Sequence, residues 1–275
     1  MHETKDGYQL EVLISTCNER ILTLPVLLKS LPQNVGVVIV HQQFSSTLSQ
    51  PALETIVQLQ AMPNVKLIQS DQPGLARSRN LALSAASASL VIIADDDIKY
   101  LPQAFDRIMQ AAEQLPQASA ITFRFINEHG QHRKRYPDGI IQRSYRNFFK
   151  VSSVELVLRR EALLRSKVRF DERFGLGAQY PVSEENIFLV DLHRAGEPIY
   201  FYPADILMHP YETSGGNWDL GYLHARGALF KRVFGWLGLP LLMVFLLKHR
   251  KVIRAQSGIF PGMSEAVKSF MRFAS

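Results

Sequence analysis

Short apolar runs alternate with longer segments of mixed polarity along the first half of the chain. The apolar runs are rich in Val, Ile and Leu, and they predict strands near residues 10–15, 35–41, 65–69 and 90–94. The segments that follow them predict helices near residues 19–31, 50–60, 75–86 and 102–115. Because such alternation produces βαβ units, we predict an α/β fold with a mostly parallel sheet and helices on both faces.

The second half of the chain has a less regular pattern. Residues 120–123 and 154–158 predict further strands among loops. Ser183 is followed by two acidic residues and then by the apolar run 187–192, which predicts a buried helix with a capped N-terminus. We find no internal repeat and no low-complexity segment.

The C-terminal region differs in composition. Residues 234–247 are 14 consecutive apolar residues, with Lys231 and Arg232 before them and the basic stretch 248–251 after them. A helix that crosses a bilayer needs about 20 apolar residues, and Pro240 weakens a continuous helix. Two interpretations stay open: the segment is a core helix or dimer contact, or it lies in the head-group region of an anionic membrane.

Length and composition indicate one globular domain with a helical appendage. With 275 residues and 47% hydrophobic content, the chain can bury a sizeable core. We divide it into a main domain, 1–215, and a helical C-terminal region, 216–275. The single cysteine, Cys17, excludes an intramolecular disulfide, and the polar segment 1–7 lacks the apolar stretch of a signal peptide. We therefore expect a cytoplasmic protein.

The net charge of +6 is not spread evenly. The basic cluster His132–Tyr136 is followed by Arg143, Arg146 and Lys150. No nucleic-acid-binding motif accompanies this cluster, so we expect no nucleic-acid partner. The cluster is either the solvated rim of a hairpin or a surface near a substrate entrance that faces diphosphate or lipid head groups.

Three consecutive aspartates, Asp95, Asp96 and Asp97, follow the buried strand predicted at 90–94. Carboxylates at a strand end lose solvation and repel one another, so a cation would stabilise them. Their oxygens suit Mg²⁺ or Mn²⁺, which also bridge phosphates. Strand alternation turns Asp96 away from the other two. The alternative is a solvated acidic turn that caps the helix beginning near Pro102.

A second acidic cluster, Glu184 and Glu185, stands at the start of the helix predicted after Ser183. Acids in a first helical turn usually interact with free backbone N–H groups. Two acidic clusters in one chain favour a further role. One would hold a metal, and the other would supply a carboxylate that takes a proton from an attacking hydroxyl.

Four segments, in this order, resemble the family 2 glycosyltransferases of the GT-A fold. Residues 12–20 resemble the first strand and nucleotide-binding turn, and residues 71–80 resemble the glycine turn with its Arg-Asn pair. Residues 93–97 resemble the Asp-any-Asp motif, and Glu184-Glu185 resembles the acidic pair that carries the catalytic base. The resemblance covers roughly residues 9–215.

Two positions depart from the family pattern. Cys17 stands where an aromatic residue usually follows the first strand. His41 and Gln42 end the second strand, where an aspartate pair usually reads the nucleotide base. This departure weakens the usual inference of a UDP-sugar donor. Members with a His-Gln pair here resemble enzymes of capsule and exopolysaccharide assembly.

The resemblance implies an inverting, metal-dependent glycosyltransferase of cell-surface polysaccharide synthesis. It would use a nucleotide-sugar donor, Mn²⁺ or Mg²⁺, and a saccharide or lipid-linked acceptor, and it would lie in the cytoplasm or peripherally on the inner face of the plasma membrane. Glu185 would be the base and Glu184 its neighbour, while Asp97, Asp95 and His209 would bind the metal. The implied donor-binding residues are Thr16, Asn18, Glu19, Gly74, Arg79, Asn80, Asp95 and Asp96.

Two other classes of function stay open. A nucleotidyltransferase acting on sugar phosphates would also need a metal-binding aspartate on an α/β sheet. It should carry a glycine-rich, lysine-containing signature near the first strand, and residues 15–19 are not one. A non-catalytic, membrane-associated scaffold would need neither acidic cluster.

Overall fold

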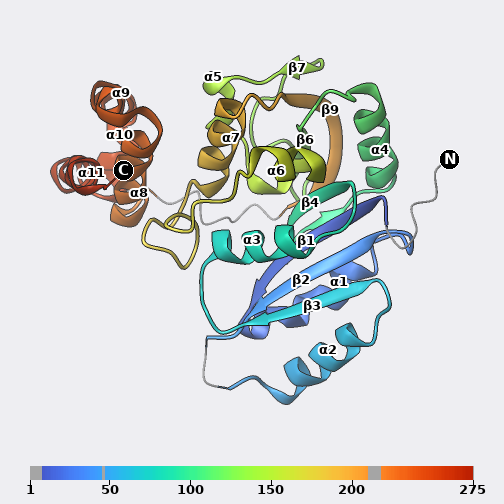
Figure 1. Cartoon of the computed structure of the whole chain (residues 1–275). Coiled ribbons are helices and arrows are strands. Elements are labelled where there is room, and N and C mark those ends of the chain that lie inside the picture. The colour runs from blue at the N-terminus through green and yellow to red at the C-terminus, as the bar shows by residue number, and fades with distance from the viewer. Residues whose placement is uncertain (1–7, 45–46, 210–217, 275) are drawn as a thin grey trace.

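One sheet organises the chain, which a computed structural model describes over residues 8–44, 47–209 and 218–274. Within these residues, nine strands pair in the order β3-β2-β1-β4-β8-β6-β9-β5, with β7 beside β9 (Figure 1). The first half of the chain supplies the parallel strands β1 (Leu10–Cys17), β2 (Gly36–Gln42), β3 (Val65–Ser70) and β4 (Leu90–Asp95). These strands confirm the predicted α/β fold.

Two expectations lie outside the described residues. The polar N-terminal segment, 1–7, is one of them. The other is the expected domain boundary after residue 215, which falls within the segment 210–217.

Three of the four helices predicted in the first half are present. They are α2 (Gln50–Gln60), α3 (Leu75–Ala85) and α4 (Ala104–Gln114). The prediction of one helix over 19–31 is wrong: the chain forms a 3₁₀ turn, η1 (Asn18–Thr23), and then the short helix α1 (Leu24–Leu28). Pro25 explains the break, because proline has no N–H to donate to a preceding turn but is accepted in the first turn of a new helix.

The second half of the chain makes the sheet mixed. Its strand β8 runs antiparallel to both β4 and β6, whereas β6 and β9 are parallel. No full-length helix connects β6 to β8 among the described residues, so the crossover that makes neighbouring strands parallel is missing there. The elements are β5 (Lys99–Tyr100), β6 (Ala120–Ile126), β7 (Ile141–Gln142), α5 (Tyr145–Phe148), η2 (Ser153–Glu155), β8 (Leu156–Arg159), α6 (Arg160–Ser166), α7 (Glu184–Arg194) and β9 (Ile199–Met208).

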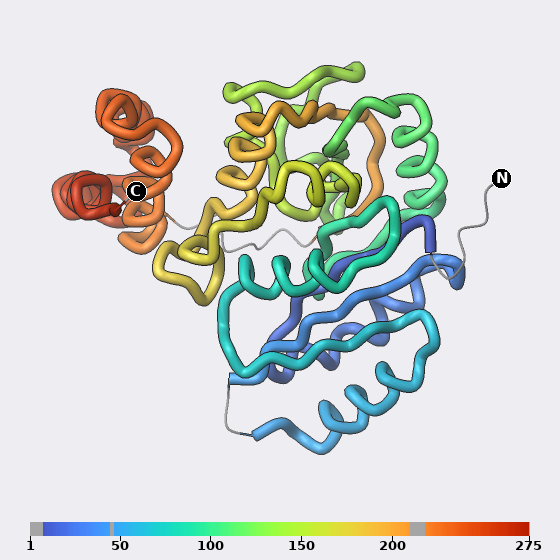
Figure 2. Tube along the Cα trace, in the orientation of Figure 1, coloured from blue at the N-terminus to red at the C-terminus, as the bar shows by residue number. Residues whose placement is uncertain are grey.

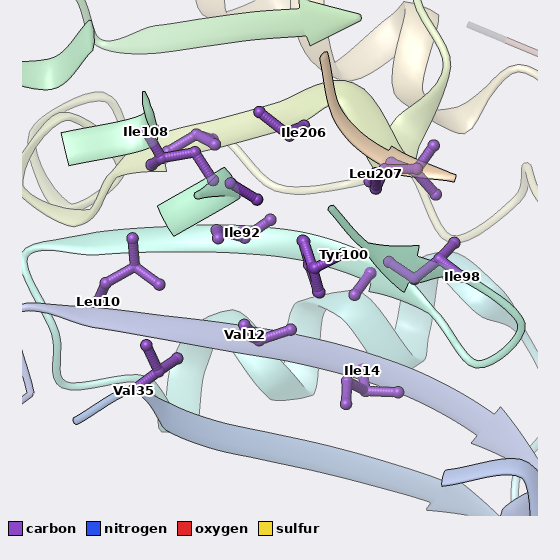
Figure 3. Close-up of a cluster of buried hydrophobic side chains, with 14 of the residues drawn as sticks. Leu10, Val12, Ile14, Val35, Ile92, Ile98, Tyr100, Ile108, Ile206 and Leu207 are labelled. Carbon is purple, nitrogen blue, oxygen red and sulfur yellow. The ribbon is translucent and has the colours of Figure 1, made fainter. Parts of the chain in front are cut away.

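Both faces of the sheet are buried, as predicted. Successive residues of β1 alternate between two cores: Val12 and Ile14 face one, and Leu13 faces the other. The first core packs against α1, α2 and α4, and Figure 3 shows its side chains, with Ile92 of β4 next to β1. The second core packs against α3, α7 and the C-terminal helix α8 (Leu220–Phe234). This packing holds the ends of β1 and β4 rigidly beside each other.

The C-terminal region is helical, as predicted, and gathers at one side of the sheet (Figure 2). After α8 come η4 (Gly235–Leu237), α9 (Gly238–Lys248), α10 (Arg250–Gln256) and α11 (Ile259–Arg272). The stretch Leu220–Lys248 is long and apolar enough to cross a membrane. It is not straight, however, because Gly235 has a left-handed φ of 57° and Gly238 approaches the backbone of Phe230. In a straight helix Phe230 and Gly238 would lie about 12 Å apart along the axis.

The apolar segment 234–247 has two faces. Leu242 and Leu246 are fully buried and pack in a small core with Leu223 of α8. This face of α9 therefore packs as the core-helix interpretation expects. The opposite face is exposed and is considered below.

Candidate active site

Two adjoining cavities open at the carboxyl ends of β1, β2 and β4, the edge where open α/β sheets bind ligands. One, of about 500 Å³, is lined by residues that include Thr16, Gln42, Gly74 and the three aspartates; we name it the aspartate cavity. The other, of about 190 Å³, is lined by residues that include Arg79, Glu184, Glu185, Tyr222 and Arg226; we name it the glutamate cavity. Both are lined by Leu75, Asp95, Leu176 and His209.

The three aspartates do not point the same way. Asp96 is buried, where it accepts hydrogen bonds from Thr16 Oγ1 at 2.6 Å and from Arg20 Nε at 2.9 Å. Asp95 and Asp97 instead approach His209, whose Nε2 lies 3.9 Å from Asp95 Oδ2 and 3.6 Å from Asp97 Oδ1. Asp95 is the last residue of β4, so the next side chain, Asp96, points to the opposite side of the chain, and the turn that follows directs Asp97 back toward His209.

The donor set of Asp95, Asp97 and His209 suits a divalent cation only in part. No three His, Cys, Asp or Glu side chains within the described ranges are grouped closely enough to hold a metal by themselves. Mg²⁺, however, is usually bound by one or two carboxylates and completed by substrate phosphates and water, and Mn²⁺ also accepts imidazole. These residues therefore fit a cation that is shared with a bound diphosphate.

Arg79 connects the two cavities. Its side chain is 1% exposed, and its guanidinium donates to Asp95 Oδ1 at 2.9 Å and to Glu184 Oε1 at 2.7 Å. Burial opposes the ionisation of Asp95, but His209 and Arg79 outweigh it and hold the pKa of Asp95 below its ordinary value. The arginine therefore holds a carboxylate of each acidic cluster in a fixed position and helps to keep Asp95 ionised.

Glu185 has a different environment from Glu184, although both lie in the first turn of α7. Burial raises the pKa of Glu185 to about 8, and the charge of Glu184 adds to the effect. A carboxylate with a pKa near physiological pH is suited to accepting a proton and releasing it again.

The predicted cap of α7 is wrong. Ser183 has a left-handed φ of 86° and makes no side-chain cap, whereas an N-cap residue is normally extended. Its buried hydroxyl has no hydrogen-bond partner in the described part of the chain. The positive end of the helix is instead next to the two glutamates.

The glycine turn forms one wall of the aspartate cavity. Gly74 has a φ of 127°, which favours glycine, and its carbonyl accepts a hydrogen bond from Gln42 Nε2 at 3.0 Å. A Cβ on Gly177 would lie 3.1 Å from the backbone N of Gly74, so the two turns pack closely. Gln42 replaces the usual acid and holds this turn in place.

Three residues expected to bind the donor support the site from outside the cavity linings. Asn18 Oδ1 accepts from the backbone N–H of Phe44, and Glu19 accepts from the backbone N–H and the hydroxyl of Ser49. Asn80 is buried on α3, where its side-chain amide donates to the backbone carbonyl of Phe170 and accepts from the backbone N–H of the same residue. None of the three is among the described residues that line either cavity.

Sequence reasoning missed several lining residues. Arg20 is the last residue of the segment 12–20 that resembles the first strand and nucleotide-binding turn, so its place in that motif was a signal that it lies at the site. Tyr222 and Arg226 come from α8, outside every motif, and Arg133 belongs to a basic cluster that the sequence left as an entrance or a hairpin rim. No sequence signal places α8 against the glutamate cavity.

Comparison with known proteins gives two kinds of match. A family model described as glycosyl transferase family 2 matches residues 11–169. Among curated proteins, no sequence matches significantly. Among solved structures, the chain is similar to residues 1–349 of S. aureus TarS, with a TM-score of 0.63 and 14% identity over 90% of this chain and 73% of that one. That protein is also solved with UDP-GlcNAc, with the same score and identity and coverage of 90% and 74%. At this identity the likeness shows the fold.

Proposed function

The chain belongs to glycosyl transferase family 2, and we propose that it moves a sugar, with inversion, from a nucleotide-sugar to a saccharide or lipid-linked saccharide in cell-surface polysaccharide synthesis. The observation that carries this proposal is the bridge made by Arg79, which joins the aspartate cavity to the glutamate cavity. The two carboxylate clusters thereby face one reaction centre, one suited to a diphosphate and its cation, the other to a proton.

The aspartate cavity is the proposed donor side. A TarS structure that holds UDP-GlcNAc in a similar fold supports a nucleotide-sugar as donor. Asp95, Asp97 and His209 would hold Mn²⁺ or Mg²⁺ together with the diphosphate. When bound, the cation supplies positive charge that stabilises the departing nucleotide diphosphate. Asp96 holds Thr16 and Arg20 at the cavity wall.

The glutamate cavity is the proposed acceptor side. Glu185 would take the proton of an acceptor hydroxyl as its oxygen attacks the anomeric carbon. The bond to the diphosphate oxygen breaks on the opposite face, so the configuration inverts. Glu184 fixes the electrostatic environment of the base, because its charge is paired with Arg79 yet still raises the pKa of Glu185.

Turnover of nucleotide-sugars tests this function directly. Purified protein is incubated with a panel of UDP-, GDP-, CMP- and dTDP-sugars, with Mn²⁺ or with EDTA, and release of the nucleotide is measured. Many transferases slowly transfer to water, so a competent donor should be hydrolysed in the presence of the cation. Absence of turnover and of nucleotide binding across the whole panel would contradict the proposal.

A pH profile is expected to follow the ionisation of Glu185. The raised pKa of about 8 means that this carboxyl is mostly protonated, and unable to act as a base, at pH 6. The value of kcat/KM should therefore rise about tenfold per pH unit and level off above about pH 8. The measurement is the initial rate at low donor concentration, with the Glu185→Gln variant as control. A profile that is flat over this range would contradict the base assignment.

We propose in addition that the exposed face of the C-terminal helices binds an anionic membrane surface. Its apolar side chains are 44% to 78% exposed and come from η4 and α9; they are Trp236, Leu237, Leu241, Val244 and Leu247. Exposed basic residues follow directly, at Lys248, Arg250 and Lys251. An apolar face bordered by positive charge complements acyl chains and anionic head groups. Such a position would suit a lipid-linked acceptor.

Vesicle binding checks this surface. The protein should pellet with phosphatidylglycerol-containing vesicles at low salt and be partly released at high salt, because each basic residue contributes about 1 kcal/mol that salt screens. Replacing Leu237, Leu241 and Val244 with glutamine should abolish pelleting. The matched control replaces Val26 and Val57, which are equally exposed on α1 and α2. If the parent protein is a dimer and the triple variant is a monomer, the exposed face binds a second copy of the chain, and the proposal of membrane binding is contradicted.

A further inference from the structure

One wall of the glutamate cavity is built by α8, a helix of the C-terminal region. Tyr222 and Arg226 lie one turn apart on this helix, and both line the cavity beside Glu185. The helix is fixed to the main domain by Arg232, which donates to Asp191 of α7 at 2.7 Å and to Asp171 at 2.9 Å. The cavity is therefore incomplete without the C-terminal region.

Arg226, which is partly buried, differs from Arg79, the fully buried arginine of the same cavity. Arg79 is neutralised by two carboxylates, whereas Arg226 makes no ion pair and no hydrogen bond within the residues that the structure describes. Its Nε is buried without a partner, and its Cζ lies 4.6 Å from the centre of the Tyr222 ring. A buried polar N–H without a partner lowers stability, and more so when the group is charged. Its presence at a cavity wall points to a ligand that satisfies it.

The chemistry of the group indicates what that ligand carries. A guanidinium offers a planar set of donors that pairs bidentately with a phosphate or a carboxylate. Arg133 lines the same cavity from the basic cluster of the main domain, so positive side chains come from two separate parts of the chain. Neither nearby acid forms an ion pair with Arg226 in the described part of the chain: Glu184 pairs with Arg79, and Arg226 acts on Glu185 only through its charge, which opposes the rise in pKa caused by burial.

We propose that the acceptor is anionic, and that Arg226 binds its phosphate or carboxylate group so that an acceptor hydroxyl lies at Glu185. This inference rests on the proposed function, since it takes the glutamate cavity as the acceptor side. It adds the substrate class and assigns a binding residue to the C-terminal region. A phosphate and a carboxylate are both recognised by paired hydrogen bonds from a guanidinium, and separate phosphate and carboxylate probes distinguish them.

Equilibrium binding to small probes tests the proposal without any turnover. The probes are glycerol 1-phosphate, methyl glucuronide and, as the neutral control, methyl glucoside, each titrated by calorimetry or ligand-observed NMR. We expect at least one anionic probe to bind about tenfold or more tightly than the neutral one. In Arg226→Gln this preference should be lost. Arg226→Lys keeps the positive charge but not the planar pair of N–H donors, so it should retain part of the preference.

The matched control is Arg254→Gln, which removes an exposed arginine of the same C-terminal region outside both cavities. It should bind all three probes like the parent. Melting temperatures check that every variant is folded. Equal affinity for neutral and anionic probes, or undiminished anionic binding in folded Arg226→Gln, would overturn the inference. Nucleotide-sugar binding and turnover are measured separately. A chain that binds anions through Arg226 but neither binds nor turns over any nucleotide-sugar would contradict the proposed function and leave the anion-binding role of Arg226 standing.

Discussion

The variant Glu185→Gln is expected to bind nucleotide normally and to lose turnover by about 10²-fold or more, the range typical of general-base removal. Glutamine keeps the size of the side chain and its place in the first turn of α7, but it cannot accept a proton. Steady-state kinetics with the donor identified by the panel, together with the thermal shift produced by nucleotide and Mn²⁺, separate the two effects. A Glu185→Gln enzyme with normal kcat would refute the base assignment.

Stability provides an internal control for this variant. The folded chain raises the pKa of Glu185 from an ordinary 4.5 to about 8, so ionisation of this group destabilises the folded state as pH rises between those values. A neutral glutamine avoids that cost. The variant should therefore melt no lower than the parent at pH 8, which distinguishes a lost base from a lost fold.

The neighbouring variant Glu184→Gln should behave differently. Glu184 is buried and pairs with Arg79, and removing one partner of a buried ion pair costs about 3–5 kcal/mol. We expect a lower midpoint in urea unfolding as well as reduced activity. If Glu184→Gln were fully stable yet inactive while Glu185→Gln retained turnover, the roles of the two acids would be reversed.

The variant Asp97→Asn is expected to abolish nearly all cation-dependent turnover and to weaken nucleotide binding only when Mn²⁺ is present. Asp97 is partly exposed, approaches His209 and accepts from Arg20 at 3.2 Å, so an amide fits without burying a new polar group. The fold should be unchanged. Nucleotide affinity measured with Mn²⁺ and with EDTA gives the result, because the difference between the two conditions should disappear in the variant.

Asp96→Asn is the matched control for the aspartate triplet. Asp96 is buried and pairs with Thr16 and Arg20 rather than with His209. Its replacement should lower the melting temperature while the response of nucleotide binding to Mn²⁺ persists. A full loss of that response in Asp96→Asn, with Asp97→Asn unaffected, would contradict the assignment of the metal to Asp95, Asp97 and His209.

Much of the parallel half of the fold could be predicted because β2 and β4 contain continuous apolar runs and β1 and β3 are rich in Val, Ile and Leu. In β1, residues on both faces are apolar because helices cover the sheet on both sides, so local composition reports the tertiary arrangement. The break at Pro25 and the antiparallel placement of β8 were not predicted. The first was visible in the sequence as a proline, but the second depends on pairing partners that lie far away along the chain.

The sequence by itself determined the two acidic clusters and their strand and helix positions, because charge and periodicity are local properties. Only the tertiary structure decided that Arg79 joins those clusters, since Asp95 and Glu184 are far apart along the chain and meet through packing of α3, β4 and α7. Likewise, composition cannot separate the buried Leu242 from the exposed Leu241, because their difference arises from which side of α9 meets α8. Arg226 became part of the site for the same reason: contacts between distant segments, and not the residues near it in sequence, brought it to the cavity.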